Sequence, residues 1–401
     1  MQRYACFIFT VMHRKKILWL CSWYPGKTEP FNGDFVQRHA RAAALYNDIY
    51  VIHVVADASG KISGIEKEII ETEGVKEHIV YYRRSLSWWG KIRSHYRWLS
   101  FSKQAIRRYI IENGKPDLVH VQVPMKSGIA ALWLKKRFKI SFVVTEHWGI
   151  YNDIEIHNYQ SKNPLFKRYT KRIFDEAANF ISVSRYLAEG VNRLVTKKNY
   201  EVVPNTVNGK LFFYKEHAAT KFRFIHVSNM VPLKNAEGIL RAFKLLLTET
   251  DKIELMMVGD TDRSIRDFAK SIGLPDAHVS FRGEVPNEQV AIEMQRSACL
   301  ILFSNIENSP CVIGEALCCG LPVISSNVGG VPELVSEQDS LLIEAGNEKA
   351  LATAMLQMIN DRSRYDRKKI AEVALRKFSY PVIGKRLDDI YEKVLVTTGK
   401  N

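Results

Sequence analysis

Short apolar runs rich in β-branched residues alternate along this chain with longer amphipathic stretches, and this alternation constrains the fold more than any other feature. The runs are KILWLCS, DIYVIHVV, DLVHVQV, SFVVTEH, NFISVS and YEVVPN in the first half, then FRFIHVSN, IELMMVGD, HVSFRGEV, CLILFSN and LPVISSN. Helical stretches such as residues 35–45 and 236–249 lie between them. Strands separated by helices predict βαβ units, and therefore an α/β fold with two doubly wound parallel sheets facing each other across a cleft.

The chain divides near the turn-rich segment PNTVNG, which opens the second series of strands. A length of 401 residues also favours two domains. We predict an N-terminal tail over residues 1–15, a first Rossmann-like domain over 16–205 and a second over 206–380. The last helix, within 381–401, is expected to cross back to the first domain.

The formal net charge is +15, and all of the excess lies in the first half of the chain. Residues 1–205 hold 33 Lys and Arg against 18 Asp and Glu, whereas residues 206–401 hold 25 of each kind. This asymmetry predicts that the two domains bind different partners and that one of these partners is anionic.

The six cysteines occur in apolar stretches without a CxxC pair, which predicts reduced core residues in a cytosolic protein. The apolar run Tyr4–Met12 resembles a signal peptide, but it is short and lacks a small-residue cleavage site. No segment reaches the ~20 apolar residues of a membrane span. We therefore expect a cytoplasmic protein that starts at Met1 or at Met12.

The stretch ENSPCVIGEALCCGLPVIS, residues 307–325, follows the buried run CLILFSN and holds two acids eight positions apart. Its pattern predicts a loop as far as Pro310 and a helix over 311–319 that Gly320 ends. Loop amides and the helix dipole at such a junction favour a phosphate. The candidates for this contact are Asn308, Ser309, Pro310 and Cys311.

The two carboxylates need a different target, because a carboxylate is a poor ligand for phosphate. A carboxylate accepts two hydrogen bonds from a vicinal diol, so sugar hydroxyls suit both acids. We predict that Glu315, in the helix, binds a ribose and that Glu307, in the loop, binds a hexose. A nucleotide diphosphate sugar is the ligand that satisfies the phosphate site and both acids.

Together with other motifs, this stretch makes the chain resemble the retaining glycosyltransferases of the two-domain GT-B type, in the group called family 4. The further motifs are VVPNTVNGKLF at 202–212, HVSNMVPLKN at 226–235, VGGVPELV at 328–335 and FSYPVIGKRLDDIYEKVL at 378–395. The resemblance extends from about Lys16 to Leu395 and is strongest in the second half. An acid pair alone is a weak signal, but this set of motifs in this order is highly specific.

The resemblance implies that His147, Lys234 and Glu307 are the catalytic residues. Lys234 would reach the donor diphosphate and neutralise the leaving group. The family usually has an arginine five positions before this lysine, where this chain has Asn229, so one phosphate-directed charge is missing. Arg282 is a candidate substitute if folding brings it close.

His147 ends the run SFVVTEH and corresponds to a family histidine that lies beside the reacting sugar. The alternative is a structural histidine. Glu146, next to it, is expected to point away by strand alternation. Gly33 is the best match to a glycine-rich loop that lets backbone approach the donor phosphates, although the family often has two glycines where this chain has Asn32 and Gly33.

The function implied by the resemblance is transfer of a hexose from a nucleotide diphosphate sugar to a glycan or lipid-linked saccharide acceptor, in the biosynthesis of a surface polysaccharide. The donor would lie mainly on the second domain and the acceptor on the first. No metal and no other cofactor is implied, although Asp260 and Asp262 are an alternative magnesium site. A two-domain sugar phosphorylase and a non-catalytic sugar-nucleotide-binding scaffold remain open.

Residues 81–110 interleave eight aromatic residues with eight Lys and Arg. Such a mixture suits a membrane interface, which would place the protein peripherally on the inner face of a membrane. A core helix with a solvated basic face explains it equally well. Single-stranded nucleic acid is a third reading, but nothing else in the chain resembles a nucleic-acid module, so we predict no nucleic-acid partner.

Overall fold

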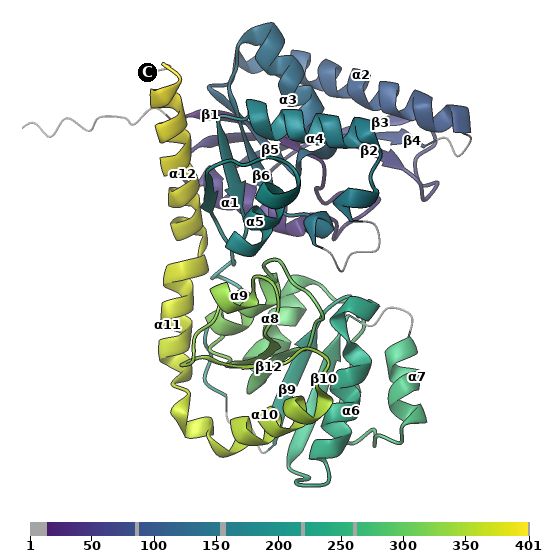
Figure 1. Cartoon of the computed structure of the whole chain (residues 1–401), viewed down its shortest axis with the longest axis vertical. Helices are drawn as coiled ribbons and strands as arrows, with labels where there is room; N and C mark the ends of the chain where they lie inside the picture. Colours follow the sequence, from purple (N-terminus) through teal and green to yellow (C-terminus); the bar gives the residue numbers. More distant parts are fainter. Residues whose placement is uncertain (1–13, 85–87, 153–157, 218–220, 260–262, 400–401) are drawn as a thin grey trace, which may run out of the picture.

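The computed structural model describes residues 14–84, 88–152, 158–217, 221–259 and 263–399. Asp260 and Asp262, the alternative magnesium ligands, and most of the predicted N-terminal tail lie outside these ranges. Two α/β domains stand one above the other along the long axis of the molecule (Figure 1). The helices α11 (Arg367–Phe378) and α12 (Tyr380–Thr397) run along one side of the pair.

The first domain is built on an 8-stranded sheet with strand order β3-β4-β2-β1-β5-β6-β7-β8. Its strands are β1 Lys16–Cys21, β2 Asp48–Asp57, β3 Ile65–Thr72, β4 Val75–Arg83, β5 Leu118–Gln122, β6 Phe142–Glu146, β7 Asn179–Ser182 and β8 Tyr200–Val202. Its helices are α1 Asp34–Ala44, α2 Trp88–Asn113, α3 Pro124–Phe138, α4 Pro164–Glu176 and α5 Arg185–Leu194. All neighbouring strands are parallel except β3 and β4.

The second domain is built on a 6-stranded parallel sheet with strand order β11-β10-β9-β12-β13-β14. Its strands are β9 Phe222–Val227, β10 Ile253–Val258, β11 Val279–Phe281, β12 Cys299–Leu302, β13 Val323–Ser326 and β14 Ser340–Ile343. Its helices are α6 Ala236–Leu246, α7 Ser264–Ser271, α8 Asn287–Gln295, α9 Cys311–Cys318, α10 Glu348–Asn360 and α11 Arg367–Phe378. In chain order the strands follow the 3-2-1-4-5-6 pattern of a doubly wound sheet, so the predicted fold class is confirmed.

One element of the first sheet was not predicted from the sequence, the antiparallel hairpin of β3 and β4. A two-residue turn joins the strands, and both of its residues have positive φ, 49° at Glu73 and 77° at Gly74. Turns of this type usually carry Asn-Gly or Asp-Gly, so Glu-Gly is a weak signal. The hairpin widens the sheet by one antiparallel edge strand.

Alternation along the strands separates two hydrophobic cores on the two faces of the first sheet. Leu18 and Leu20 of β1 belong to the core covered by α2, α3, α4 and α5. Ile17 and Trp19 belong to the other core, which α1 covers together with the last helix, α12 Tyr380–Thr397. The C-terminal helix therefore completes the first domain rather than the second.

Close backbone contact and two polar contacts hold α12 on the first domain. A Cβ at Gly384 would lie 2.1 Å from the carbonyl oxygen of Ala42 in α1, so only glycine allows this approach. Tyr391 forms a 2.6 Å hydrogen bond to the buried His120 Nδ1. Lys15 donates to Asp388 at 2.7 Å.

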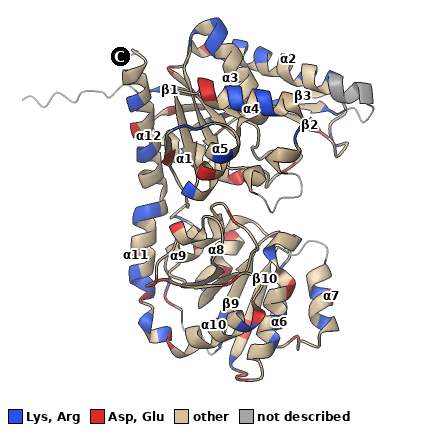
Figure 2. Cartoon of the chain, in the orientation of Figure 1, with Lys and Arg blue, Asp and Glu red and all other residues tan. Residues whose placement is uncertain are grey.

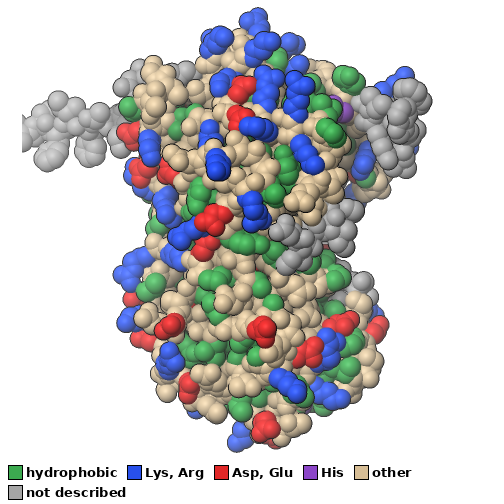
Figure 3. Space-filling view, viewed as in Figure 1, with side chains coloured by type: hydrophobic (Ala, Val, Ile, Leu, Met, Phe, Trp, Pro, Cys, Tyr) green, Lys and Arg blue, Asp and Glu red, His purple; other side chains and the backbone are tan. Residues whose placement is uncertain are grey.

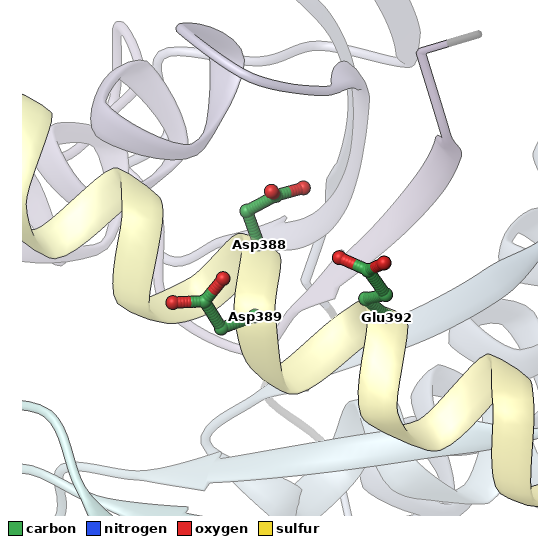
Figure 4. Close-up of side chains that lie close together, drawn as sticks. All are labelled: Asp388, Asp389 and Glu392. Atoms are coloured by element: carbon green, nitrogen blue, oxygen red, sulfur yellow. The ribbon is translucent and has the colours of Figure 1, made fainter. Parts of the chain in front are cut away.

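Asp388, Asp389 and Glu392 lie close together on the same helix (Figure 4). Lys385 pairs with both aspartates, at 3.1 and 2.8 Å, and Asp389 and Glu392 are exposed. These ion pairs account for the acidic cluster, which we do not interpret as a metal site.

Residues 81–110 form the end of β4 and most of α2. Of the six aromatic side chains described in this segment, Tyr81, Tyr82, Trp98 and Tyr109 are buried, whereas Tyr96 is 69% exposed. Most of the aromatic rings therefore pack in the first domain, and the arginines remain on its surface, as in the core-helix interpretation. Lys and Arg residues are frequent in the helices of the first domain (Figure 2), and their side chains gather on the face of this domain that Figure 3 shows. No helix in the described part of the chain has the length and apolar character needed to cross a bilayer.

Replacing Gly384 with alanine should destabilise the first domain, because the new methyl group would overlap the Ala42 carbonyl and push α12 away from α1. We expect a loss of about 1–3 kcal/mol, the usual cost of overpacking. Thermal unfolding would measure it. Val396→Ala is the control, since Val396 lies on the same helix and is 57% exposed. An equally small effect of both substitutions would contradict the close contact.

Candidate active site

The topology of both sheets directs the loops at their carboxyl ends toward the cleft between the domains. In a doubly wound sheet, ligands bind outside the carboxyl ends at the point where strand order reverses. That point lies between β1 and β5 in the first sheet and between β9 and β12 in the second. The candidate residues lie on loops that follow β6, β9 and β12.

Glu307 lies in the loop between β12 and α9 and is 8% exposed. Its Oε1 accepts hydrogen bonds from Lys234 Nζ at 2.6 Å and from Ser304 Oγ at 2.7 Å. Lys234 ends a short helical turn after β9. The structure therefore brings together the predicted hexose-binding acid and the predicted phosphate-binding cation.

Glu315 lies within α9 and meets a residue of the other domain. The guanidinium of Arg38, on α1, donates to Glu315 Oε1 and also to Asp34 Oδ2, the latter at 2.7 Å. Burial raises the pKa of Glu315, and Arg38 opposes this effect. The second carboxylate oxygen has no partner among the described residues and is available for a ribose.

A cavity of about 290 Å³ opens between α1 and the carboxyl end of the second sheet. It is lined by the end of β9 with Asn229, by the loop containing Glu284 and Val285, by Cys311 and Glu315 of α9, and by Arg38. Glu315, the residue predicted to bind a ribose, thus lines the cavity beside the loops that follow β9, β10 and β11. Its position suits the nucleoside part of a donor.

The proposed substitute for the missing arginine, Arg282, does not line this cavity. Its Nε pairs with Glu293 at 3.2 Å, and the side chain is 51% exposed. Arg38 lines the cavity together with Asn229, so a cation of the first domain lies beside Asn229's segment. The sequence indicates only the local pair of Arg38 with Asp34, four positions before it, because Glu315 lies 277 positions away.

His147 immediately follows β6 and is buried. Its Nε2 lies 2.9 Å from Gln122 Oε1, and an amide oxygen only accepts, so Nε2 carries the proton. Burial, followed by the nearby His39 and His120, holds the pKa of His147 well below its usual range. The ring is therefore neutral, and Nδ1, which is buried without a partner, offers a lone pair.

Asn308 connects this histidine to the loop that carries Glu307. Its Nδ2 donates to the backbone oxygen of His147 at 3.2 Å, and its Oδ1 accepts from Asn152 Nδ2 at 3.0 Å. Both contacts cross between the domains. Residues 307–308 therefore lie directly opposite the candidate catalytic histidine.

The remaining residues of the predicted phosphate-binding loop lie beside Asn308. The Ser309 carbonyl accepts from Asn205 Nδ2 at 2.6 Å, and its hydroxyl is buried without a partner. Pro310 immediately precedes α9, and Cys311 is the first residue of the helix. A further contact between the domains involves Glu333 of the VGGVPELV motif, whose carboxylate accepts from the first two amides of α5 at 2.7 and 2.9 Å.

Gly33 immediately precedes α1 and has a φ of 77°. A Cβ at this position would lie 2.6 Å from the carbonyl carbon of Trp23, so the loop after β1 requires glycine here. Gly33 itself is not among the residues that line the donor cavity, but Phe31, Asp34 and Arg38 of the same segment are.

Glu146 points into its own loop, as strand alternation predicts. It accepts hydrogen bonds from the backbone amides of His147 and Trp148, at 2.8 and 2.9 Å, and from the Tyr151 hydroxyl at 2.8 Å. Burial raises its pKa to about 7, and these hydrogen bonds oppose the shift. The carboxylate holds the loop that follows His147.

Two family models match the chain in succession. The model described as Glycosyltransferase Family 4 matches residues 38–210, and the model described as Glycosyl transferases group 1 matches residues 208–375. Their junction lies at the turn-rich segment between the two sheets.

Curated relatives are similar over most of their length. The chain is 27% identical over 412 residues to TuaC of Bacillus subtilis, which is named for teichuronic acid biosynthesis, and the match covers 96% of both chains. It is 26% identical over 296 residues to N-acetyl-alpha-D-glucosaminyl L-malate synthase of Bacillus anthracis, covering 70% of this chain and 75% of the relative.

Solved structures share the fold at lower identity. The sucrose-phosphate synthase of Thermosynechococcus elongatus superposes with a TM-score of 0.75 at 20% identity, covering 96% of this chain and all of that one. Anabaena HepE in complex with UDP superposes with a TM-score of 0.71 at 18% identity, covering 94% of this chain and 100% of HepE.

Glu146 should make stability depend on pH in a defined window. Its unfolded carboxyl loses a proton near pH 4.5, whereas the folded one keeps it to about pH 7, so the free energy of unfolding should fall as pH rises between these values. Compared with Glu146→Gln, the wild type should lose on the order of 3 kcal/mol across this window. Denaturant unfolding at several pH values would measure it.

Glu372→Gln provides the control for this comparison, because Glu372 is exposed on α11. Its stability should parallel that of the wild type at every pH. A Glu146→Gln variant that also parallels the wild type would mean that Glu146 is ionised throughout the window.

Proposed function

We propose that this chain, which belongs to the family 4 (group 1) glycosyltransferases of the GT-B type, moves a hexose from a nucleotide diphosphate sugar to a glycan or lipid-linked saccharide acceptor with retention of configuration. The observation that carries the proposal is the contact of Asn308 with His147. It places the acid-containing loop of the second domain against the candidate catalytic histidine of the first.

The donor would lie along the carboxyl end of the second sheet. The nucleoside would occupy the 290 Å³ cavity, with Glu315 Oε2 accepting hydrogen bonds from the ribose. Lys234 and Arg38 would both neutralise the charge of the diphosphate. Arg38 would do so in place of the family's usual arginine, at whose position this chain has Asn229. Glu307 would bind hexose hydroxyls beside Lys234. The UDP bound to the structural relative HepE supports a nucleotide in this fold.

Three groups would act on the reacting atoms. As the bond from the anomeric carbon to the diphosphate oxygen breaks, Lys234 would stabilise the charge that develops on the leaving oxygen. His147 Nδ1 would accept a hydrogen bond from a hexose hydroxyl. The acceptor hydroxyl would attack from the same face of the sugar and pass its proton to the departing phosphate.

The position of Glu146 favours this front-face route over a double displacement. A double displacement requires a carboxylate nucleophile on the opposite face of the sugar. Glu146, the nearest carboxylate to His147 in sequence, is occupied by two backbone amides and the Tyr151 hydroxyl. It would have to leave three hydrogen bonds to attack a sugar.

The biological setting is also a proposal. A role in surface polysaccharide biosynthesis is supported by TuaC, the relative named for teichuronic acid biosynthesis that matches 96% of this chain. We place the protein in the cytoplasm, at the inner face of the membrane where a lipid-linked acceptor would be found, with contact through the basic surface of residues 81–110. The cations Lys234 and Arg38 would serve the diphosphate without a metal or other cofactor.

The two alternative functions, a sugar phosphorylase and a non-catalytic scaffold, predict different behaviour of this site. A sugar phosphorylase would depend on inorganic phosphate for turnover, and a non-catalytic scaffold would bind the nucleotide sugar without turning it over. The pairing of Lys234 with Glu307 at the cleft favours transfer, because a leaving group needs a cation next to the sugar.

Glu315→Gln should weaken binding of the nucleotide sugar by about 1–3 kcal/mol, because an amide accepts ribose hydrogen bonds less strongly than a carboxylate. Calorimetry with UDP, GDP, ADP and their hexose conjugates, with and without EDTA, would identify the base and measure the change. Arg38→Gln is the companion variant, because it breaks the same ion pair and leaves the ribose ligand; the loss of affinity that it shows measures the proposed contact of Arg38 with the diphosphate. Wild-type affinity in Glu315→Gln would remove Glu315 from the ribose role.

Lys234→Ala should lower turnover by about 100-fold and donor affinity much less, because the charge it neutralises is largest as the bond breaks. Lys210→Ala, an exposed lysine, is the control. Proton NMR of the wild-type product should show the anomeric configuration of the donor. Unchanged turnover in Lys234→Ala would assign the leaving group to Arg38, and inversion would exclude the retaining mechanism.

A further inference from the structure

A second and larger cavity, of about 550 Å³, lies entirely within the first domain. Its lining comes from the carboxyl ends of β1 and β2, from Arg84 just after β4, from Lys126 at the start of α3 and from His95 of α2. These elements surround the crevice where the strand order of the first sheet reverses, between β1 and β5. The first domain therefore has a ligand-sized space of its own, separate from the donor cavity.

The charged side chains of this cavity are predominantly cationic. The cations Arg84 and Lys126 come from two different elements, and Glu29 is the acid among the lining residues. The Glu29 carboxylate accepts a 2.5 Å hydrogen bond from Asn32, another lining residue. No ion pair or side-chain hydrogen bond joins Arg84 or Lys126 to another described residue.

This arrangement differs from that of the cations in the donor site. Arg38 and Lys234 each donate to a carboxylate, whereas Arg84 and Lys126 line one cavity and have no carboxylate partner among the described residues. Burial and the nearby Arg84 lower the pKa of Lys126, so these two cations repel each other. Burial and the nearby Lys126 lower the pKa of His95, which favours its neutral form. An anionic ligand would relieve the repulsion between the two cations.

Aromatic rings connect the cavity to the candidate catalytic histidine. Trp23 lines the cavity, and the centroid of its ring lies 6.3 Å from the centroid of the Phe35 ring. The centroid of the Phe35 ring in turn lies 4.9 Å from the centroid of the His147 ring. Two aromatic rings therefore separate the cavity from His147, and a molecule that reaches from one to the other must pass them.

We infer that this cavity binds a phosphate or diphosphate group carried by the acceptor, with Arg84 and Lys126 as its principal ligands. A dianion matches two cations from different elements better than a single carboxylate does. The inference rests on the proposed function, because it assigns the anion to the molecule whose hydroxyl reaches His147. The anion can belong to a polyprenyl phosphate or to a soluble sugar phosphate, which share this chemistry.

Titration of inorganic pyrophosphate into the full chain, already saturated with the nucleoside diphosphate that it binds, would test the site. The wild type should bind pyrophosphate under these conditions. Arg84→Gln and Lys126→Gln should each weaken binding about tenfold, and the double variant should weaken it further. Arg83→Gln is the matched control, since Arg83 carries the same charge, is exposed and does not line the cavity.

Two further titrations distinguish the sources of the phosphate. One uses glucose 1-phosphate, and the other uses phosphatidylcholine vesicles with and without polyprenyl phosphate. Binding of either that is lost in the double variant but kept in Arg83→Gln supports the site and names the source. Absence of binding to all three probes, or equal binding by the double variant and Arg83→Gln, would overturn it.

Nucleoside diphosphate binding separates failure of this site from failure of the proposed function. It should be the same in wild type and double variant, which also shows that the variant is folded. If the wild type binds no nucleoside diphosphate, the proposed donor site fails. The comparison of the double variant with Arg83→Gln, made without nucleotide, then still decides whether the anion site exists.

Discussion

In the two described sheets all neighbouring strands are parallel except one edge hairpin, and the loops at the carboxyl ends of these sheets meet at one cleft. Parallel strands place successive loops at the same edge of a sheet. For this reason His147, Lys234 and Glu307, which are up to 160 positions apart, lie on loops that meet at this cleft. The geometry of the candidate site follows from strand direction and strand order more than from any single side chain.

Polar contacts across the cleft fix the position of one domain relative to the other. Arg38 pairs with Glu315, Asn308 donates to the backbone of His147, and Glu333 caps α5. Removing one partner of a buried ion pair leaves an uncompensated charge, so substitution of either Arg38 or Glu315 alone would destabilise the contact between the domains. Because the same carboxylate is the proposed ribose ligand, donor binding and domain contact share one group. A nucleotide that engages Glu315 would therefore change the balance between open and closed arrangements.

The two cavities differ in the pairing of the cations in or near them. Arg38 and Lys234, the cations of the proposed donor site, are held by Asp34, Glu315 and Glu307. Arg84 and Lys126, which line the cavity of the first domain, form no ion pair with another described residue. The excess of basic residues in the first half of the chain favours anionic partners for the same domain.

The sequence by itself determined the fold class, because strand and helix periodicities reflect local geometry that each segment carries with it. It also indicated the loop and helix of residues 307–320, whose turn residues and caps are local. Three features depended on the tertiary structure. The β3–β4 hairpin turns at Glu-Gly, a weak local signal. Four of the six described aromatic residues of 81–110 are buried in the first domain, which their spacing alone does not reveal. Arg38, which we propose in place of the missing arginine, pairs with a carboxylate 277 positions away, and charge pairing over such a separation has no signature in a single sequence.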